Sequence, residues 1–293
     1  MEPERVKLKD IKPALSRYIR ESQSLLKISA IPDEKVVHDI RVLMKKSRAA
    51  LKLAGSQLNI ESLNRDMLAF REVGRKMCVW RETSVFRKTL KELRKENPGI
   101  FSRLKDNEQL AALCKKTETL QEQTLEIKDL LEQINDLLRK AGFRIRFQSM
   151  NKFDPHLLLK ELGLTYTKVV DVYLTCRNNP KPCNLHEFRK KSKDFLYQVY
   201  FFRPLNPSFV KAIEKKLDVM TMNLGKFNDL TQLVKALGYK YPDSTNLPAM
   251  DELVIKIREK QDRYLVKVWP IAYKVFCPGQ KIENFPGFKL PVI

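Results

Sequence analysis

The sequence predicts an all-α protein built as two four-helix bundles that are related by a pseudo-twofold axis. Three observations support this fold class. Apolar residues recur with helical periodicity along nearly the whole chain, glycine is scarce at 9 of 293 residues, and one charged helical pattern occurs twice. An internal duplication explains the repeat, because each half of the chain then forms one bundle.

The first half is predicted to begin with a helix over about residues 5–28. Asp33 then has the position of an N-cap, because a short polar side chain there satisfies the free backbone N–H groups of the helix that follows. That second helix should end near Gly55. Further helices are expected over about 60–96, 104–117 and 118–140.

Two irregular segments interrupt the helical pattern of the first half. Asn97-Pro98-Gly99 is a strong helix break. Residues 143–147 (FRIRF) alternate like a short strand, but they have no convincing partner strand. We therefore interpret residues 141–155 as a linker between the two halves.

The second half repeats the plan of the first. Asn178-Asn179-Pro180 separates its first two helices, and Pro204 follows the second of them. From Pro278 onward the chain contains proline and glycine and is predicted to be non-helical. The expected helices cover about 155–177, 183–202, 207–223, 226–238 and 249–275.

A charged pattern marks the second helix of each half. A histidine is followed by an arginine three residues later and by a lysine seven residues later, and the two copies lie 148 residues apart. At about 100° per residue, these offsets place the three side chains on one narrow face of a helix, which we call the basic stripe. Lys52 extends the first stripe and Tyr197 the second. The two copies are His38, Arg41 and Lys45, and His186, Arg189 and Lys193.

Apolar residues occupy the opposite side of both helices, so each helix is predicted to bury one side and to present its stripe on the other. These apolar residues are Val37, Ile40, Met44 and Leu51 in the first copy, and Phe188, Phe195, Val199 and Phe202 in the second.

A second landmark supports the duplication. Arg81-Glu82 begins 43 residues after His38, and Asn228-Asp229 begins 42 residues after His186. Two landmarks with nearly the same spacing predict two related lobes whose stripes lie toward a common surface.

The stripes predict binding of an extended anion. Neighbouring cations on a helical face, such as Arg41 with Lys45 or Arg189 with Lys193, lie about 5–6 Å apart and repel each other. When a polyanion lies across the face, its attraction to these cations outweighs the repulsion between them. Arginine offers a forked donor to phosphate oxygens, and lysine offers a mobile point charge.

The net charge of the chain also points to an anionic partner. The formal charge is +21, from 56 Lys and Arg against 35 Asp and Glu, although residues 106–136 carry eight acids and three lysines. Nucleic acid, an anionic membrane and a phosphate polymer are the candidate partners. No apolar run is long enough to span a membrane, and the N-terminus lacks the apolar segment of a signal peptide, so we expect a cytoplasmic protein that does not bind membranes.

Signals for catalysis are absent from the sequence. It has no phosphate-binding glycine loop, no His-Glu-x2-His motif and no clustered carboxylates suited to Mg²⁺. The five cysteines are scattered without a Cys-x2-Cys pair, so they are predicted to be free thiols. We therefore expect no metal, no cofactor and no catalytic residues.

Four segments resemble the CHAD family, the conserved-histidine α-helical domain. VVHDIRVLMKKSRAALKL and LHEFRKKSKDFLYQVYFF are similar to its two signature helices, and FREVGRKMCVWRETSVF and LDVMTMNLGKFNDLTQL are similar to the helices that follow them. The resemblance implies one domain over 1–293, made of lobe 1 (about 5–145), lobe 2 (about 150–277) and an irregular tail (278–293). It also implies that the basic helices line a central groove or pore.

The resemblance further implies inorganic polyphosphate as the ligand and an association with polyphosphate granules. This chain has Lys45-Lys46 where the family usually has two arginines, which keeps the charge but loses the forked donor geometry. With the stripe residues and Arg81 included, the candidate polyphosphate-binding residues are His38, Arg41, Lys45, Lys46, Arg48, Lys52, Arg81, His186, Arg189, Lys190, Lys193 and Tyr197.

The leading hypothesis from the sequence is a non-enzymatic polyphosphate-binding module that also accepts other phosphorylated polyanions. The alternative is a nucleic-acid-binding protein that contacts the phosphate backbone. The stripes carry few aromatic residues on which bases could stack, and Tyr197 is the exposed candidate. A phosphohydrolase is a third hypothesis, which divalent-metal-dependent phosphate release would establish.

Overall fold

In the computed structural model the protein is all-α. The structure describes residues 8–27, 32–118, 124–150, 153–239 and 248–289, with the side chains at 79–83, 116–118 and 124–126 excepted; this part of the chain contains no strand. The helices are α1 (Ile11–Leu26), α2 (Glu34–Leu53), α3 (Ile60–Lys76), α4 (Cys78–Glu96), α5 (Pro98–Arg103), α6 (Glu108–Glu118), α7 (Thr124–Phe147), α8 (Pro155–Asn178), α9 (Pro182–Val199), α10 (Pro207–Ala236) and α11 (Pro248–Val275).

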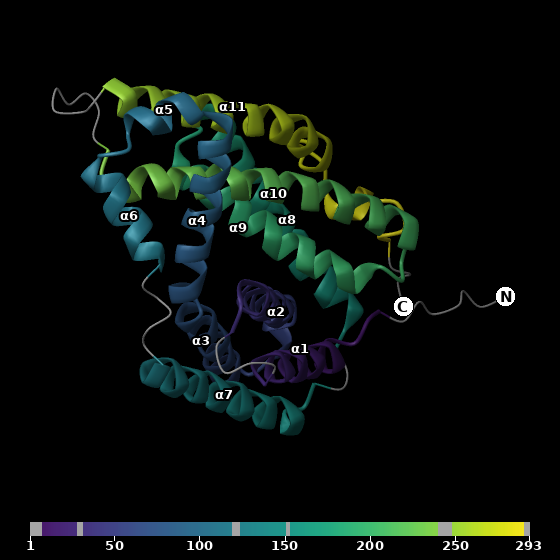
Figure 1. Ribbon diagram of the computed structural model, residues 1–293. Coiled ribbons are helices and arrows are strands. Elements are labelled where there is room, and N and C mark those ends of the chain that lie inside the picture. The colour runs from purple at the N-terminus through teal and green to yellow at the C-terminus, as the bar shows by residue number, and fades with distance from the viewer. Residues whose placement is uncertain (1–7, 28–31, 119–123, 151–152, 240–247, 290–293) are drawn as a thin grey trace.

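Helices α1, α2, α3 and α7 pack together as one bundle (Figure 1). Local capping residues define where its helices start. The side chain of Asp33 accepts a hydrogen bond of 2.7 Å from the backbone N–H of Val36, which confirms Asp33 as the N-cap of α2. Asn59 caps α3 in the same way, through the backbone N–H groups of Glu61 and Ser62.

Helices α8, α9, α10 and α11 form the other bundle. Aromatic side chains fill its centre. The ring of Tyr166 lies 5.5 Å from that of Phe195 and 5.8 Å from that of Phe276, and its hydroxyl donates to the backbone carbonyl of Val275 at 2.9 Å. Burial of this phenol is tolerated because its hydroxyl has a hydrogen-bond partner.

The two bundles share one hydrophobic core, and α2 and α9 are in contact where they meet. In Figure 1, α2 is seen nearly end-on between α1, α3 and α7 below and the other bundle above. The amide nitrogen of Gln198 donates to the backbone carbonyl of Ala49 across this contact, at 3.2 Å. The apolar sides predicted for the two stripe helices are confirmed, since every residue named for them is at most 1% exposed.

Helices α4, α5 and α6 leave the first bundle and pack on α10 and α11 (Figure 1). They form a second hydrophobic cluster, in which Leu93 and Phe101 pack near Leu233 and Leu253. The predicted single segment 60–96 is therefore two helices, because the chain turns at Met77 and α4 crosses to the other bundle.

Two predicted interruptions are wrong. The expected linker 141–155 is helical as far as Phe147, because Leu138, Ala141 and Ile145 recur at helical spacing and are completely buried. The expected break between 207–223 and 226–238 does not exist, and α10 is one helix of 30 residues. Gly225 lies inside α10, where its missing side chain leaves room for Arg189.

The tail beyond Pro278 contains no α-helix in its described part, which ends at Lys289, as predicted. Its apolar residues nevertheless complete the core. Ile282, Phe285 and Phe288 are at most 3% exposed, and the ring of Phe285 packs 5.3 Å from that of Tyr166. The tail therefore stabilises the second bundle.

Candidate functional site

The arginine of each stripe donates a hydrogen bond to a backbone carbonyl of the next long helix in its bundle. Arg41 donates through Nη1 to the backbone carbonyl of Gly74, at the end of α3, and to Cys78 Sγ at 2.9 Å. Arg189 donates through Nε to the backbone carbonyl of Thr221 in α10, at 3.3 Å. Both guanidinium groups are half-buried and held in place.

The residues in these two contacts are separated by nearly the same number of positions in each half, as the predicted repeat requires. Gly74 follows Arg41 by 33 residues, and Thr221 follows Arg189 by 32. The second landmarks then lie seven residues further along, at Arg81 and Asn228. The side chain of Arg81 lies outside the described residues, whereas Asn228 hydrogen bonds to His186. The duplication itself stays a prediction.

The two stripes contribute to a common cavity of about 450 Å³, which we call the tyrosine pocket. It lies among α1, α2, α9, α10 and the short 3-10 helix Tyr200–Phe202. Four of the predicted site residues line it: His38, Lys46, Lys193 and Tyr197. The other lining residues are Arg17, Tyr18, Val42, Leu196, Tyr200, Arg203, Glu214 and Asp218.

Lys46 and Lys193 bring positive charges of the two stripe helices, α2 and α9, together in this pocket. Burial lowers the pKa of Lys193, and the charges of Arg189 and Lys46 lower it further, whereas Asp218 raises it. The carboxylate of Asp218 lies 3.2 Å from Lys193 Nζ. An anion placed between the stripes would relieve this repulsion.

Tyr197 is half-buried rather than exposed, which corrects the sequence-based expectation. Burial raises its pKa to about 12, so the phenol is neutral near pH 7. The Nζ atom of Lys193 lies 5.6 Å from the centre of its ring. Tyr197 therefore forms part of the pocket wall.

The sequence-based reasoning missed the contribution of α1 and of the 3-10 helix after α9. Lys9 and Arg17 both hydrogen bond to the hydroxyl of Tyr200, and these contacts lower the pKa of Tyr200. Arg203 lies over the same ring at 4.6 Å and pairs with Glu214. Tertiary packing brings these side chains close to the stripes, and helical periodicity alone does not predict such packing.

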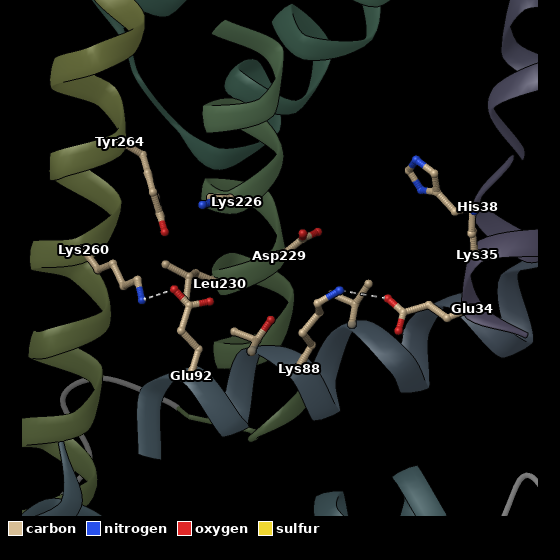
Figure 2. A pocket seen from close by; sticks show the side chains of 12 residues that line it. Glu34, Lys35, His38, Lys88, Glu92, Lys226, Asp229, Leu230, Lys260 and Tyr264 are labelled. Atoms are coloured by element: carbon tan, nitrogen blue, oxygen red, sulfur yellow. Dashed lines mark hydrogen bonds and ion pairs between the residues drawn. The ribbon is translucent and has the colours of Figure 1, made fainter. Parts of the chain in front are cut away.

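A second cavity, of about 660 Å³, opens among α2, α4, α10 and α11, and we call it the central pocket (Figure 2). His38 lines both this cavity and the tyrosine pocket, so the two adjoin at His38. In Figure 2, His38 from α2 and Asp229 from α10 point into the space between their helices. The remaining lining residues are Glu34, Lys35, Val85, Lys88, Thr89, Glu92, Lys226, Leu230, Lys260 and Tyr264.

Ion pairs in the central pocket tie α4 to its neighbours (Figure 2). Lys88 pairs with Glu34 of α2 at 3.5 Å. Lys260 of α11 is only 8% exposed and contacts Glu92 and Glu96 at 2.8 Å each. These hydrogen-bonded carboxylates raise the pKa of Lys260 although burial opposes them, so Lys260 stays charged.

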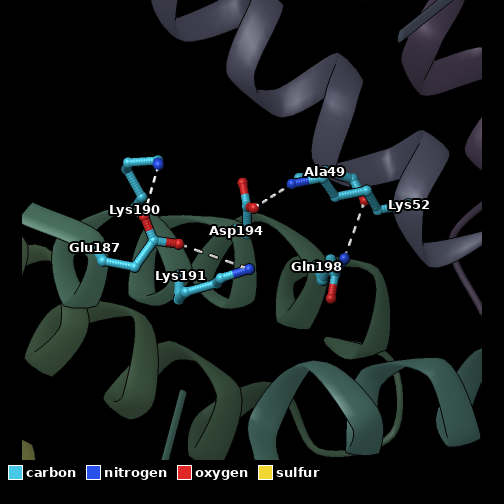
Figure 3. Close-up of polar contacts among 7 residues, drawn as sticks. All are labelled: Ala49, Lys52, Glu187, Lys190, Lys191, Asp194 and Gln198. Carbon is cyan, nitrogen blue, oxygen red and sulfur yellow. Dashed lines mark hydrogen bonds and ion pairs between the residues drawn. The ribbon is translucent and has the colours of Figure 1, made fainter. Parts of the chain in front are cut away.

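A third cavity, of about 640 Å³, lies between α2 and α3 on one side and α8 and α9 on the other. We call it the lysine pocket; it is lined by Lys52, Gly55, Leu63, Asn64, Met67, Leu68, Arg71, Glu161, Thr165, Lys168, Lys191, Asp194 and Gln198. Figure 3 shows Lys52 of α2 paired with Asp194 of α9.

Arg48 and Lys190 have different surroundings from the residues of the tyrosine pocket. Burial lowers the pKa of Arg48, as do the charges of Arg71 and Arg41, whereas Asp194 raises it. Lys190 is exposed and pairs with Glu187 at 2.6 Å (Figure 3). The predicted residues thus separate into a cluster at the tyrosine pocket and a second group around Lys52 and Arg48.

His186 and Lys45 lie outside the three cavities. His186 is exposed beside Asn228, and partial desolvation lowers its pKa. Lys45 is half-buried on α2. The five cysteines are free thiols, as predicted.

Within the described residues, no group of three or more His, Cys, Asp or Glu side chains is placed to hold a metal ion. In the same part of the chain, no helix combines the length and the apolar composition needed to cross a bilayer.

Comparisons with known proteins identify the family. No curated protein matches the chain. Among solved structures, the chain is similar to the crystal structure of the CHAD domain from the plant Ricinus communis, with a TM-score of 0.60 and 14% identity over 95% of this chain and 98% of the other. The model of the CHAD domain family matches residues 12–238, which is most of the sequence. The chain therefore belongs to the CHAD family.

Proposed function

We propose that this protein binds inorganic polyphosphate, without catalysing a reaction on it, along the basic stripes of α2 and α9. Membership of the CHAD family supports this choice, because the resemblance implies that ligand and an association with polyphosphate granules in the cytoplasm. The observation that carries the proposal is the meeting of Lys46 of α2 and Lys193 of α9 in a single cavity that His38 and Tyr197 of the two stripes also line.

The surroundings of these lysines suit a linear chain of phosphates. The tyrosine pocket and the central pocket adjoin at His38, so a polymer that crosses from one to the other passes both stripes. Arg41 and Arg189 are fixed by backbone carbonyls, which reduces the conformational entropy lost when they contact phosphate. Mobile lysines follow the rest of the chain as point charges.

A titration of long-chain polyphosphate tests the proposal. Removing both shared charges, with Lys46→Gln and Lys193→Gln, should weaken binding by about tenfold near physiological salt and reduce the salt slope of log K by about 1.4. The matched control removes two exposed charges outside the three pockets, with Lys267→Gln and Lys274→Gln. Equal losses in the two variants would show that the positive surface attracts polyanions without a defined site.

A further inference from the structure

Helix α7 carries two exposed phenylalanines on the side that faces away from the rest of the molecule. Phe143 is 66% exposed and Phe147 is 69% exposed, and their ring centres lie 4.7 Å apart. The other phenylalanines of the chain are buried or half-buried. In Figure 1, α7 lies along the lower edge of the molecule, where it packs on α1 and α3. Adjoining exposed rings are unusual on a protein surface and indicate contact with another molecule.

The charged residues on the same side of α7 are separated by sign along the helix. At about 100° per residue, Phe143 lies opposite the buried side of α7, which contains Ile134 and Ile145. Within about 60° of Phe143 around the helix, acids precede bases, with Lys128 as the exception. We call this surface the outward face; it has an acidic half and a basic half. The acids are Asp129, Glu132 and Asp136, and the bases are Arg139, Lys140 and Arg146.

The charge balance of the outward face does not suit a polyanion. Its four bases and three acids give a formal charge of +1, whereas the whole chain carries +21. Asp136 pairs with Arg139 at 2.8 Å and with Lys140 at 2.7 Å, which reduces the positive potential of the basic half. The exposed carboxylates of Asp129 and Glu132 repel nucleic acid and anionic lipid. A partner that carries both signs of charge fits this face better.

A second copy of the same face provides this charge pattern. When two α7 helices pack antiparallel about a twofold axis near the middle of the helix, each acidic half lies over the basic half of the other copy. A parallel arrangement would instead place like charges together. The antiparallel arrangement also removes Phe143 and Phe147 of both copies from water, which favours association.

We propose that two copies of this chain form a twofold dimer through the outward faces of antiparallel α7 helices. An interface built mainly from one helix of each copy is small, roughly 1,200 Å² or less in total, so the dissociation constant should be on the order of 10 μM. No described residue of α7 lines the tyrosine, central or lysine pocket, so the contact does not use the proposed polyphosphate site. The inference goes beyond polyphosphate binding and does not require it.

Sedimentation velocity of the whole chain, at about 1–100 μM protein and near-physiological salt, tests for the dimer. Polyphosphate is left out, because a polymer can bridge two monomers. The sedimentation coefficient should rise with protein concentration, from that of a monomer toward that of a dimer. A monomer at every concentration overturns the inference.

Charge-reversal variants test the antiparallel arrangement. One variant reverses the basic half, with Arg139→Glu and Arg146→Glu, and the other reverses the acidic half, with Asp129→Lys and Glu132→Lys. Each variant alone should associate at least about tenfold more weakly than the unaltered chain, because its outward face then carries mostly one sign of charge. An equimolar mixture of the two should associate again, because their faces are complementary. Dimers that persist in both variants, or a mixture that stays monomeric, overturn the inference.

Two further variants separate the α7 contact from a general effect of charge. Phe143→Gln with Phe147→Gln should weaken association by about tenfold, because the rings no longer leave water in the contact. Lys267→Glu with Lys274→Glu reverses two exposed charges on α11; it is the matched control and should associate like the unaltered chain. Equal losses in these two variants, with thermal melts that confirm folding, overturn the inference.

Vesicles that contain phosphatidylserine distinguish a membrane from a second copy as the occupant of the outward face. The unaltered chain and the Phe143→Gln, Phe147→Gln variant are sedimented with these vesicles. We expect the two proteins to pellet equally. A chain that stays monomeric, and whose pelleting is lost in the variant, has a membrane contact at this face, and that result overturns the dimer.

Discussion

The stripe helices α2 and α9 share their pattern but differ in how their charges are balanced. On α9, Lys190 and Lys191 pair with Glu187, and Lys193 pairs with Asp218. On α2, Arg48 is desolvated and lies in the field of two further cations, Arg41 and Arg71, and one carboxylate, Asp194, which Lys52 shares. We infer that the two helices share the spacing of their His, Arg and Lys side chains, while the positive potential is concentrated on α2.

The largest effect is expected from removing three charges on α2, with Lys45→Gln, Lys46→Gln and Arg48→Gln. At about 1 kcal/mol for each cation, this variant should lose about a hundredfold in polyphosphate affinity. The comparison variant removes the same number of charges from α9, at Lys190, Lys191 and Lys193. It should lose only about tenfold, because those lysines are partly neutralised by acids. Equal losses, measured by titration at one salt concentration, would contradict the inferred asymmetry.

A smaller effect is expected from two glycines that lie next to the anchored arginines. A Cβ atom at Gly225 would lie 3.2 Å from Nε and Nη2 of Arg189, whereas a Cβ atom at Gly74 has nothing within 4 Å. Gly225→Ala should therefore displace Arg189 and weaken polyphosphate binding by about threefold, since a forked donor depends on its geometry.

Gly74→Ala is the matched control for that substitution. It should leave binding unchanged and stabilise the fold by about 0.5–1 kcal/mol, because alanine is the better helix former. Thermal melts and titrations of the two variants check both expectations. Unchanged binding in Gly225→Ala would show that the position of Arg189 does not matter for the ligand.

The smallest effect concerns pH and His186. Desolvation holds its folded pKa below the ordinary value of 6.5. Its contribution to stability is therefore present above pH 6.5 and is lost as the pH falls through 6.5 toward the folded pKa. A polyanion favours the protonated form, so affinity should rise by about threefold between pH 8 and pH 5.5. The rise should be smaller in His186→Gln, and an unchanged pH profile in that variant would remove His186 from the site.

The sequence predicted the fold well where the pattern is local. The buried sides of α2 and α9 follow from periodicity, and Asp33 caps α2 as expected. The errors occurred where tertiary contacts override a local signal. A break was expected between residues 223 and 226, but the helix continues there and Gly225 leaves the space that Arg189 occupies; the alternating segment 143–147 is the last turn of α7.

The candidate site was predictable only in part, for the same reason. Spacing along a helix brought Lys193 into the prediction, and the resemblance to the CHAD family brought in Lys46. It did not show that Tyr200 and Arg203 would lie beside them, nor that Glu214 and Asp218 of α10 would face the stripes. The packing of different helices brings these residues together, so no single segment carries their pattern.

The most direct test of polyphosphate binding is a competition titration near physiological salt. Labelled long-chain polyphosphate is bound first, and duplex DNA or single-stranded RNA of matched charge is added in excess. We predict that polyphosphate stays bound, and that its binding is lost in a folded variant with Arg41, Lys45, Arg189 and Lys193 changed to alanine. Equal displacement by nucleic acid would contradict the account and would make nucleic-acid binding the better description of this surface.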